Sequence, residues 1–316
     1  MNARQAELQA AYLARQASQR ALSPHTIKVW QYDIEKLSAF LARNNLDGWH
    51  SLTVEGLEGL IADCSASGLD IRSQQRLLST LRSFYDWLVD NDAATSNPAR
   101  SLCLKTHKRE LPHVLDVDAM QALLDQPAPD DAYERALWIR DRAMMELFYS
   151  SGLRLSELAY ARASDLDLAA GYITVTGKGK RMRRLPVGRK ARAALTEWLA
   201  RRPLWLGVDD ITGERVESDG WLFITSKGQR FAERAIQLRL DYQARRASLP
   251  QHVHPHMLRH SFASHLLESS HDLRAVQELL GHADISTTQI YTHLDYQHLA
   301  DTYDKAHPRS RHKSEV

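Results

Sequence analysis

The sequence predicts a mainly helical protein of two domains, with a small antiparallel β-sheet in the second domain. The chain is 316 residues long, which exceeds the usual size of one hydrophobic core. Apolar residues recur at helical spacing along most of the chain. One stretch differs, because β-branched residues precede a glycine-containing turn there, as in a β-hairpin.

The first hundred residues are predicted to be all-helical. Ser23-Pro24 can cap and open a helix over residues 24–41, and a second amphipathic helix runs from about residue 73 to residue 90. Arg76 and Arg82 lie outside the apolar side of this second helix. The segment therefore forms a helical domain.

A polar, basic segment between Pro98 and Pro112 interrupts the helical pattern. We interpret residues 105–112 as an interdomain linker; a surface loop inside one domain is the alternative. The predicted organisation is a helical domain over residues 1–104, this linker, a second domain over residues 113–304 and a basic tail over residues 305–316. We expect its basic part, Arg309–Lys313, to be disordered.

The second domain is predicted to combine a hairpin with many helices. Strands are indicated at residues 172–176 and 182–187 around a turn at 177–180, and residues 221–225 can supply one more short strand. Helices are expected near 118–124, 136–149, from 156, and at 189–201, 231–247, 257–269, 272–280 and 286–293. Lys178 is thereby placed at the tip of the hairpin.

The composition excludes several classes of protein. No apolar run approaches the length of a bilayer span, and the polar N-terminus lacks the apolar core of a secretory signal, so we expect a cytoplasmic protein. Cys64 and Cys103 are interpreted as reduced thiols without a function. The net charge is only +2, but Gly177 to Arg192 holds eight basic residues and no acidic one. Such a run is either a solvated face or a site for a polyanion.

Two segments place a cation where a phosphate could bind. Arg154 follows the helix-breaking Gly152 and stands at the start of a new helix, and both a helix N-terminus and a guanidinium attract phosphate. The alternative is an arginine paired with Glu157 or Asp165. Lys178 lies between two glycines among other cations, which lower a lysine pKa and suit a proton donor. The alternative is a plain turn lysine.

Two further segments supply histidines, an arginine and a tyrosine. His256 and Arg259 are three residues apart, so at the start of a helix they point to the same side. A metal site is an alternative, because His256 and His260 have the spacing of a zinc-binding helix, but Met257 stands where a metalloprotease carries glutamate. Further on, Gly281 ends a helix, His282 follows, and Tyr291 lies on the next helix. A tyrosine in such a place is usually a packing or surface residue.

Taken in order, these segments resemble the tyrosine recombinase family, which includes phage integrases and the Xer recombinases. Four sequence motifs carry the resemblance. They are Ser-Gly-Leu-Arg-Leu-Ser-Glu-Leu at 151–158, the hairpin with Lys178, His-Pro-His-Met-Leu-Arg-His at 254–260, and Leu-Leu-Gly-His at 279–282 with Tyr291. The resemblance implies a helical core-binding, SAM-like DNA-binding domain followed by a mixed α/β catalytic domain. Residues 293–299 and 303–309 look most like the XerC subtype.

The resemblance also implies a catalytic set and a mechanism. The set is Arg154, Lys178, His256, Arg259, His282 and the nucleophile Tyr291. The tyrosine would form a 3′-phosphotyrosine, the two arginines and His282 would hold the phosphate oxygens, His256 would be the base and Lys178 the acid. No cofactor and no metal is needed, because the arginines supply the charge of a metal ion.

The resemblance implies three partners: a double-stranded DNA recombination site, an XerD-like recombinase in a heterotetramer on the DNA, and a cell-division DNA translocase. The implied role is the resolution of chromosome dimers. The segment after Tyr291 would dock on a neighbouring subunit. Phosphate contacts are predicted from both domains, and they carry affinity rather than sequence readout. The residues are Arg76, Arg82, Lys105, Lys108, Lys180, Arg181, Arg183 and Arg184.

Three rival functions stay open at this stage. A mobile-element integrase of the same family would use the same residues on other DNA sites. A DNA-binding relative without catalysis would not need Tyr291 together with Lys178. A metal-dependent nuclease would lose its activity in chelator, and the acidic ligands of such a site are absent from the four segments.

Overall fold

The computed structural model describes residues 3–19, 24–104, 114–177, 182–206, 220–280, 303 and 306–309. The chain divides into two compact units, Met1–Glu110 and Leu111–Val316. The predicted fold class is confirmed: the described residues are mostly helical and hold one small antiparallel sheet. The linker predicted at residues 105–112 lies outside the described residues.

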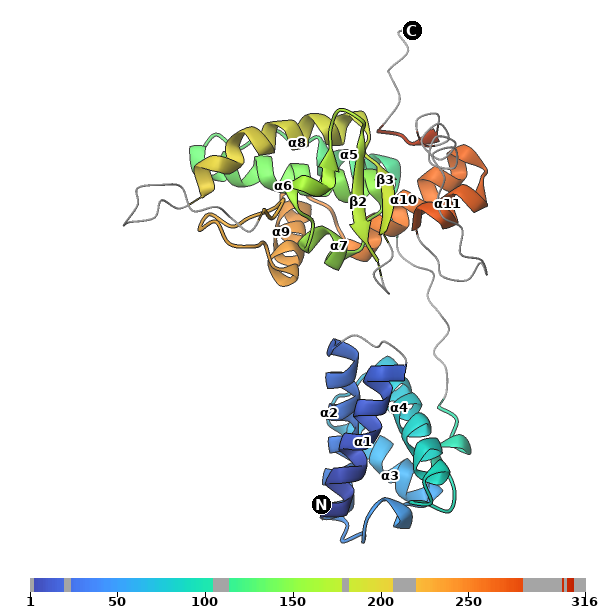
Figure 1. Cartoon of the computed structure of the whole chain (residues 1–316). Coiled ribbons are helices and arrows are strands. Elements are labelled where there is room, and N and C mark those ends of the chain that lie inside the picture. The colour runs from blue at the N-terminus through green and yellow to red at the C-terminus, as the bar shows by residue number, and fades with distance from the viewer. Residues whose placement is uncertain are drawn as a thin grey trace, which may run out of the picture. The chain divides into compact units, whose positions relative to one another are not determined.

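The first unit is a helical bundle (Figure 1). It consists of α1 (Ala3–Gln19), α2 (Pro24–Arg43), α3 (Val54–Ala66) and α4 (Ile71–Asp90), with single 3₁₀ turns at Trp49–Ser51 and Pro98–Arg100. The side chains of Thr53 and Asp70 cap α3 and α4. Buried aromatic rings gather in the core, where Phe84 lies edge-on to both Tyr12 and Trp49.

The helices of the second unit surround one long buried helix. They are α5 (Val117–Leu124), α6 (Ala132–Ser151), α7 (Leu155–Ala159), α8 (Arg189–Arg201), α9 (Glu233–Arg246), α10 (Pro255–Ser270) and α11 (Leu273–Leu280). Both α8 and α10 pack on α6, which is buried on every side in its second half (Figure 1). The 3₁₀ turns Ala163–Asp165 and Arg202–Trp205 connect neighbouring elements.

The sheet of the second unit holds the strands β1 (Leu166–Asp167), β2 (Tyr172–Thr176) and β3 (Met182–Pro186) in the order β1-β2-β3, all antiparallel. Val175 of β2 is paired with Arg183 of β3. The strand expected at residues 221–225 was wrong. That segment makes only isolated bridges, from Trp221 to Arg162 and from Ile224 to Arg230, because a loop and not a strand lies beside it.

Gly152 determines how the chain passes from α6 to α7. It caps α6 in the left-handed conformation, with φ of 58°. A Cβ atom at this position would lie 2.4 Å from Cδ1 of Phe262 on α10. Only glycine fits, and the turn brings the following Arg154 against the start of α10.

The expectation of a disordered basic tail over Arg309–Lys313 was wrong at Arg309, and His307 just before it is buried as well. His307 is fully buried and Arg309 is 4% exposed. Arg309 forms ion pairs with Asp125 and with the buried Glu146, and the hydroxyl of Tyr303 lies 2.8 Å from Oγ of Ser150. These acidic partners lie far away in the sequence, so the basic composition alone suggested a free tail.

Among the helices of the described residues, none is long and apolar enough to cross a membrane.

Candidate active site

Arg154 stands at the N-cap position of α7, where its backbone and side chain both bind Glu157. Its backbone N–H donates to Oε2 of Glu157 at 2.8 Å, and its NH1 donates to Oε1 at 2.9 Å. The ion pair that the sequence offered as an alternative is therefore present. The side chain of Arg154 is still 39% exposed, so the guanidinium is anchored at one edge and accessible to solvent at another.

Arg259 is a buried cation that binds carbonyl groups. It lies in the first two turns of α10, its residue is 9% exposed, and its guanidinium donates to the carbonyls of Gly152 and Leu280. Burial, and secondarily the nearby charge of Arg154, lower the pKa of Arg259 to about 10. At neutral pH the side chain stays charged.

The two arginines converge on one atom. Arg154 donates from NH2 to the carbonyl oxygen of Leu280 at 3.4 Å, and Arg259 donates to the same oxygen at 2.6 Å. Leu280 is the last residue of α11, and the carbonyls at the end of a helix carry partial negative charge. Residues 154 and 259, more than a hundred positions apart in the sequence, are thus neighbours in space, as the sequence predicted.

Glu157 balances part of this charge. Its side chain is 3% exposed and also receives a fork from Arg183 of β3, with NH1 to Oε1 at 2.8 Å and NH2 to Oε2 at 3.0 Å. Burial would raise the pKa of Glu157, but the hydrogen bonds and charges of Arg183 and Arg154 outweigh burial and hold the pKa below its ordinary value. The guanidinium groups of Arg154 and Arg183 therefore both bind this one carboxylate.

His256 lies in the first turn of α10, after Pro255, and is exposed. The ring of the N-cap residue His254 lies 6.3 Å from it, centroid to centroid. His260 is exposed as well, and partial burial, followed by the charges of His256 and Arg259, lowers its pKa. His256 is thus on the same helix turn as Arg259 and open to solvent. Among the residues described, no group of three or more metal-ligating side chains occurs.

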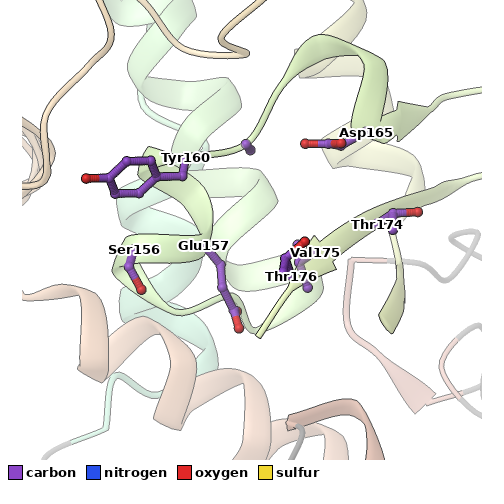
Figure 2. A pocket seen from close by; sticks show the side chains of 8 residues that line it. Ser156, Glu157, Tyr160, Asp165, Thr174, Val175 and Thr176 are labelled. Atoms are coloured by element: carbon purple, nitrogen blue, oxygen red, sulfur yellow. The ribbon is translucent and has the colours of Figure 1, made fainter. Parts of the chain in front are cut away.

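A cavity of about 220 Å³ lies beside this cluster, between α7 and β2 (Figure 2). In Figure 2, Glu157 and Tyr160 leave α7 in different directions. The wall is half polar and half apolar and includes residues with hydroxyl and carboxylate groups; its residues are Ser156, Glu157, Tyr160, Ala161, Asp165, Thr174, Val175 and Thr176. Glu157 therefore lines the cavity as well as binding Arg154 and Arg183.

The remaining members of the predicted catalytic set, Lys178, His282 and Tyr291, lie outside the described residues. The predicted DNA contacts Lys105, Lys108, Lys180 and Arg181 also lie outside them. What the structure brings together from the predicted set is Arg154, Arg259 and the turn that carries His256.

The predicted DNA contacts that the structure describes differ in accessibility. Arg184 is exposed and stacks 4.7 Å from the ring centroid of Tyr172. Arg76 pairs with the buried Asp33, and Arg82 donates to the carbonyls of Ala99 and Leu102. Arg183 uses both ends of its fork on Glu157. Arg82 and Arg183 therefore have internal partners, and their role as phosphate contacts stays a prediction that this geometry does not favour.

From the sequence, Glu157 was expected only as an alternative ion-pair partner of Arg154, in place of a phosphate. It was not predicted to belong to the site. A glutamate three residues after a helix N-cap is a readable signal, because it can bind the N-cap backbone. The link from Glu157 to Arg183 has no such signal, since it joins a helix to a strand 26 residues later.

Family models and known proteins give similarities over both units. Residues 113–298 match the model of the phage integrase family, and residues 10–92 match that of the phage integrase N-terminal SAM-like domain. Proteins named tyrosine recombinase XerC are similar over nearly the whole chain. The one from Pseudomonas fluorescens is 49% identical over 95% of this chain and 96% of its own; the one from Azotobacter vinelandii is 50% identical over 98% and 99%.

Solved structures share the fold at low sequence identity. The XerH site-specific recombinase bound to its difH substrate matches with a TM-score of 0.65 and 22% identity, over 94% of this chain and 83% of that one. The Tn1549 transposon integrase in complex with transposon right end DNA matches with a TM-score of 0.67 and 18% identity, over 93% and 98%. At such identities the likeness shows the fold.

Proposed function

This chain belongs to the phage integrase family and is an XerC-like site-specific tyrosine recombinase, and from that premise we propose how its residues cut and rejoin DNA. The oxygen of Tyr291 attacks the scissile phosphorus, an O–P bond to tyrosine forms, and the bond from phosphorus to the 5′-oxygen breaks. The 5′-hydroxyl of a partner strand then attacks the 3′-phosphotyrosine and releases the tyrosine. The phosphodiester is kept without water or an energy source.

The single observation that supports this mechanism is the convergence of Arg154 and Arg259 at the carbonyl of Leu280. Glu157 balances one charge between Arg154 and Arg183, and Arg259 binds two backbone carbonyls and, among the described residues, no carboxylate. The cluster therefore keeps excess positive charge, which suits a phosphate whose charge grows in the transition state. In our proposal the two arginines bind the non-bridging oxygens, together with His282. They supply the charge that a divalent cation would otherwise provide.

The proton transfers are assigned to a base and an acid. His256 takes the proton of Tyr291, because an imidazole can act as a general base and this side chain is exposed on the same helix turn as Arg259. Lys178 gives a proton to the departing 5′-oxygen. Both assignments rest on the family's motif and on the position of His256 at the start of α10.

The test is incubation with a nicked suicide substrate followed by mapping of the covalent protein–DNA bond. We expect a bond at Tyr291 that forms in EDTA and is lost in Tyr291→Phe. Arg154→Ala and Arg259→Ala should slow cleavage by about 10² to 10³-fold. Trapping at another residue, or loss of cleavage in EDTA, would overturn the proposal. A catalytically inactive relative would form no bond at all.

The partners are a finer proposal. The similarity to proteins named XerC extends over nearly the full chain, so we assign the chain to a heterotetramer with an XerD-like recombinase on a double-stranded DNA site. The helical domain over residues 1–104 and the catalytic domain over 113–304 both contact the duplex. Chromosome dimer resolution in the cytoplasm, with a cell-division DNA translocase as activator, is the role that fits such an assembly.

A mobile-element integrase is the alternative within the family. Purified protein should recombine a chromosomal dimer-resolution site only when an XerD-like protein is added. Efficient recombination of a mobile element's ends by this chain alone would favour the integrase.

A further inference from the structure

Arg183 lies on β3 and is 10% exposed, and both ends of its guanidinium fork are bound to the carboxylate of Glu157. A parallel, bidentate pair of this kind fixes the positions of both side chains. An arginine held in this way is turned toward the protein. Its sequence position, within a run of cations, suggested a phosphate contact, whereas its geometry indicates an internal task.

Each of the two carboxylate oxygens of Glu157 is shared between Arg154 and Arg183. Oε1 accepts from NH1 of both arginines, and Oε2 accepts from the backbone of Arg154 and from NH2 of Arg183. The charge of Glu157 is thus divided. Without Arg183 the whole carboxylate charge would act on Arg154, and in a buried place such an attraction is strong.

Of the two cations, Arg154 is the accessible one, with 39% of its side chain exposed. It also reaches the carbonyl shared with Arg259. Because Arg183 neutralises part of the charge of Glu157, Glu157 neutralises less of the charge of Arg154. More of the positive charge of Arg154 is then available to bind an external anion.

We propose that Arg183 is a positioning residue, which holds Glu157 and so leaves the cationic charge of Arg154 available to the scissile phosphate. The pair also ties β3 to the N-terminus of α7, and β3 begins directly after the segment that carries Lys178 in the sequence. The inference rests on the proposed phosphate-binding role of Arg154. Arg183 itself does not touch DNA.

The experiment measures single-turnover cleavage of the nicked suicide substrate at saturating DNA. Four proteins are compared: wild type, Arg183→Met, Glu157→Gln and the double variant. Arg183→Met should cleave about 100-fold more slowly at neutral pH, because the undivided carboxylate then neutralises Arg154. Removing the carboxylate charge as well should restore the rate to within about tenfold of wild type.

The pH profile separates this role from a merely structural one. Glu157 faces Arg154 on α7, Arg183 on β3 and Arg259 on α10, and Tyr160 and Asp165 line the same cavity. In Arg183→Met the carboxylate loses a cation and two hydrogen bonds, so its pKa rises and it becomes protonated as the pH falls. The rate of this variant should therefore increase towards low pH relative to that of the double variant.

The effect of Arg183→Met in the Glu157→Gln background decides the question even if the single variant fails to fold. A loss below about threefold in that background supports the proposal. An equal, hundredfold loss in both backgrounds would mean that Arg183 acts directly on DNA, and the proposal would fail. It would fail as well if Arg183→Met cleaved like wild type.

Two controls complete the design. Arg239→Met removes another arginine from a buried carboxylate, that of Asp141, in the same unit, and should lower stability without changing the cleavage rate of the folded protein. A wild type that forms no bond at Tyr291 would instead refute the proposed function, so the two failures are distinguishable.

Discussion

Two buried arginines of the second unit are held in opposite ways. Arg309 is 4% exposed and binds the carboxylates of Asp125 and Glu146, whereas Arg259 is 9% exposed and binds two backbone carbonyls. Burial lowers the pKa of an arginine in both places. For Arg309 the two carboxylates outweigh burial and raise the pKa, while for Arg259 the pKa falls to about 10.

The difference distinguishes an arginine whose charge is neutralised inside the protein from one whose charge stays available to a bound anion. A buried cation with carboxylate partners is neutralised inside the protein, and removing it leaves an unpaired anion. A buried cation without a carboxylate partner can bind an anion from outside the protein. Its burial is not offset by an ion pair, so the folded protein is less stable. The lowering of the pKa of Arg259 to about 10 corresponds to a destabilisation of its charged form in the folded protein by about 3 kcal/mol at neutral pH.

The largest expected effect is on stability at Arg309. Arg309→Met should lower the free energy of unfolding by about 3–5 kcal/mol, because the fully buried Glu146 is left without its cation. Chemical denaturation measures it. The double variant with Glu146→Gln should recover most of the loss; a double variant as unstable as the single one would contradict the assignment.

Arg259→Met should show the reverse pattern. Cleavage should slow by about 10² to 10³-fold, equivalent to roughly 3–4 kcal/mol of barrier. The free energy of unfolding should change by only about 1 kcal/mol, since the lost hydrogen bonds are offset by the removal of a buried charge. If Arg259→Met lowered the free energy of unfolding as much as Arg309→Met does, the proposed difference between the two arginines would be refuted.

A smaller effect is expected from pH near Arg309. Burial lowers the pKa of His307 to about 3 from an ordinary value of 6.5. The unfolded chain therefore binds a proton below pH 6.5 that the folded chain does not, and stability falls as the pH falls. Between pH 6.5 and 5 this contributes about 2 kcal/mol. His307→Phe keeps a ring beside Tyr303 and should lose less stability over the same pH range; equal losses would exclude His307 as the cause.

The smallest effect concerns the turn that holds Arg259. Gly152→Ala should lower stability by about 1–2 kcal/mol, because a Cβ there meets Phe262 and the φ of 58° is unfavourable for alanine. Cleavage should slow as well, because the carbonyl of Gly152 binds Arg259. Phe262→Leu in the same background should relieve the contact but not the backbone strain, which thermal unfolding can resolve. No recovery at all would show that the contact is unimportant.

The sequence predicted what local patterns encode. The hairpin strands at 172–176 and 182–187 agree with β2 and β3 to within one residue, because β-branched residues and glycines define them locally. The nearness of Arg154 and Arg259 was implied by the resemblance to the tyrosine recombinase family. The roles of the six catalytic residues stay predictions, and Lys178, His282 and Tyr291 lie outside the described residues.

The sequence did not predict the ion pairs between residues that lie far apart in the chain. The tail residue Arg309 finds Asp125 and Glu146 more than 160 positions earlier, and Arg183 finds Glu157 across a helix and a strand. Every one of these residues is an ordinary surface type by composition. Only the folded arrangement distinguishes them from solvated charges.

The carbonyl of Leu280 joins the two cations to the chain that follows. It accepts from both Arg154 and Arg259, and the stretch with His282 and Tyr291 starts at the very next position. A displacement of this one oxygen would loosen both guanidinium groups together. In the proposed mechanism, the two phosphate-binding cations and the segment that carries the nucleophile therefore meet at a single peptide group.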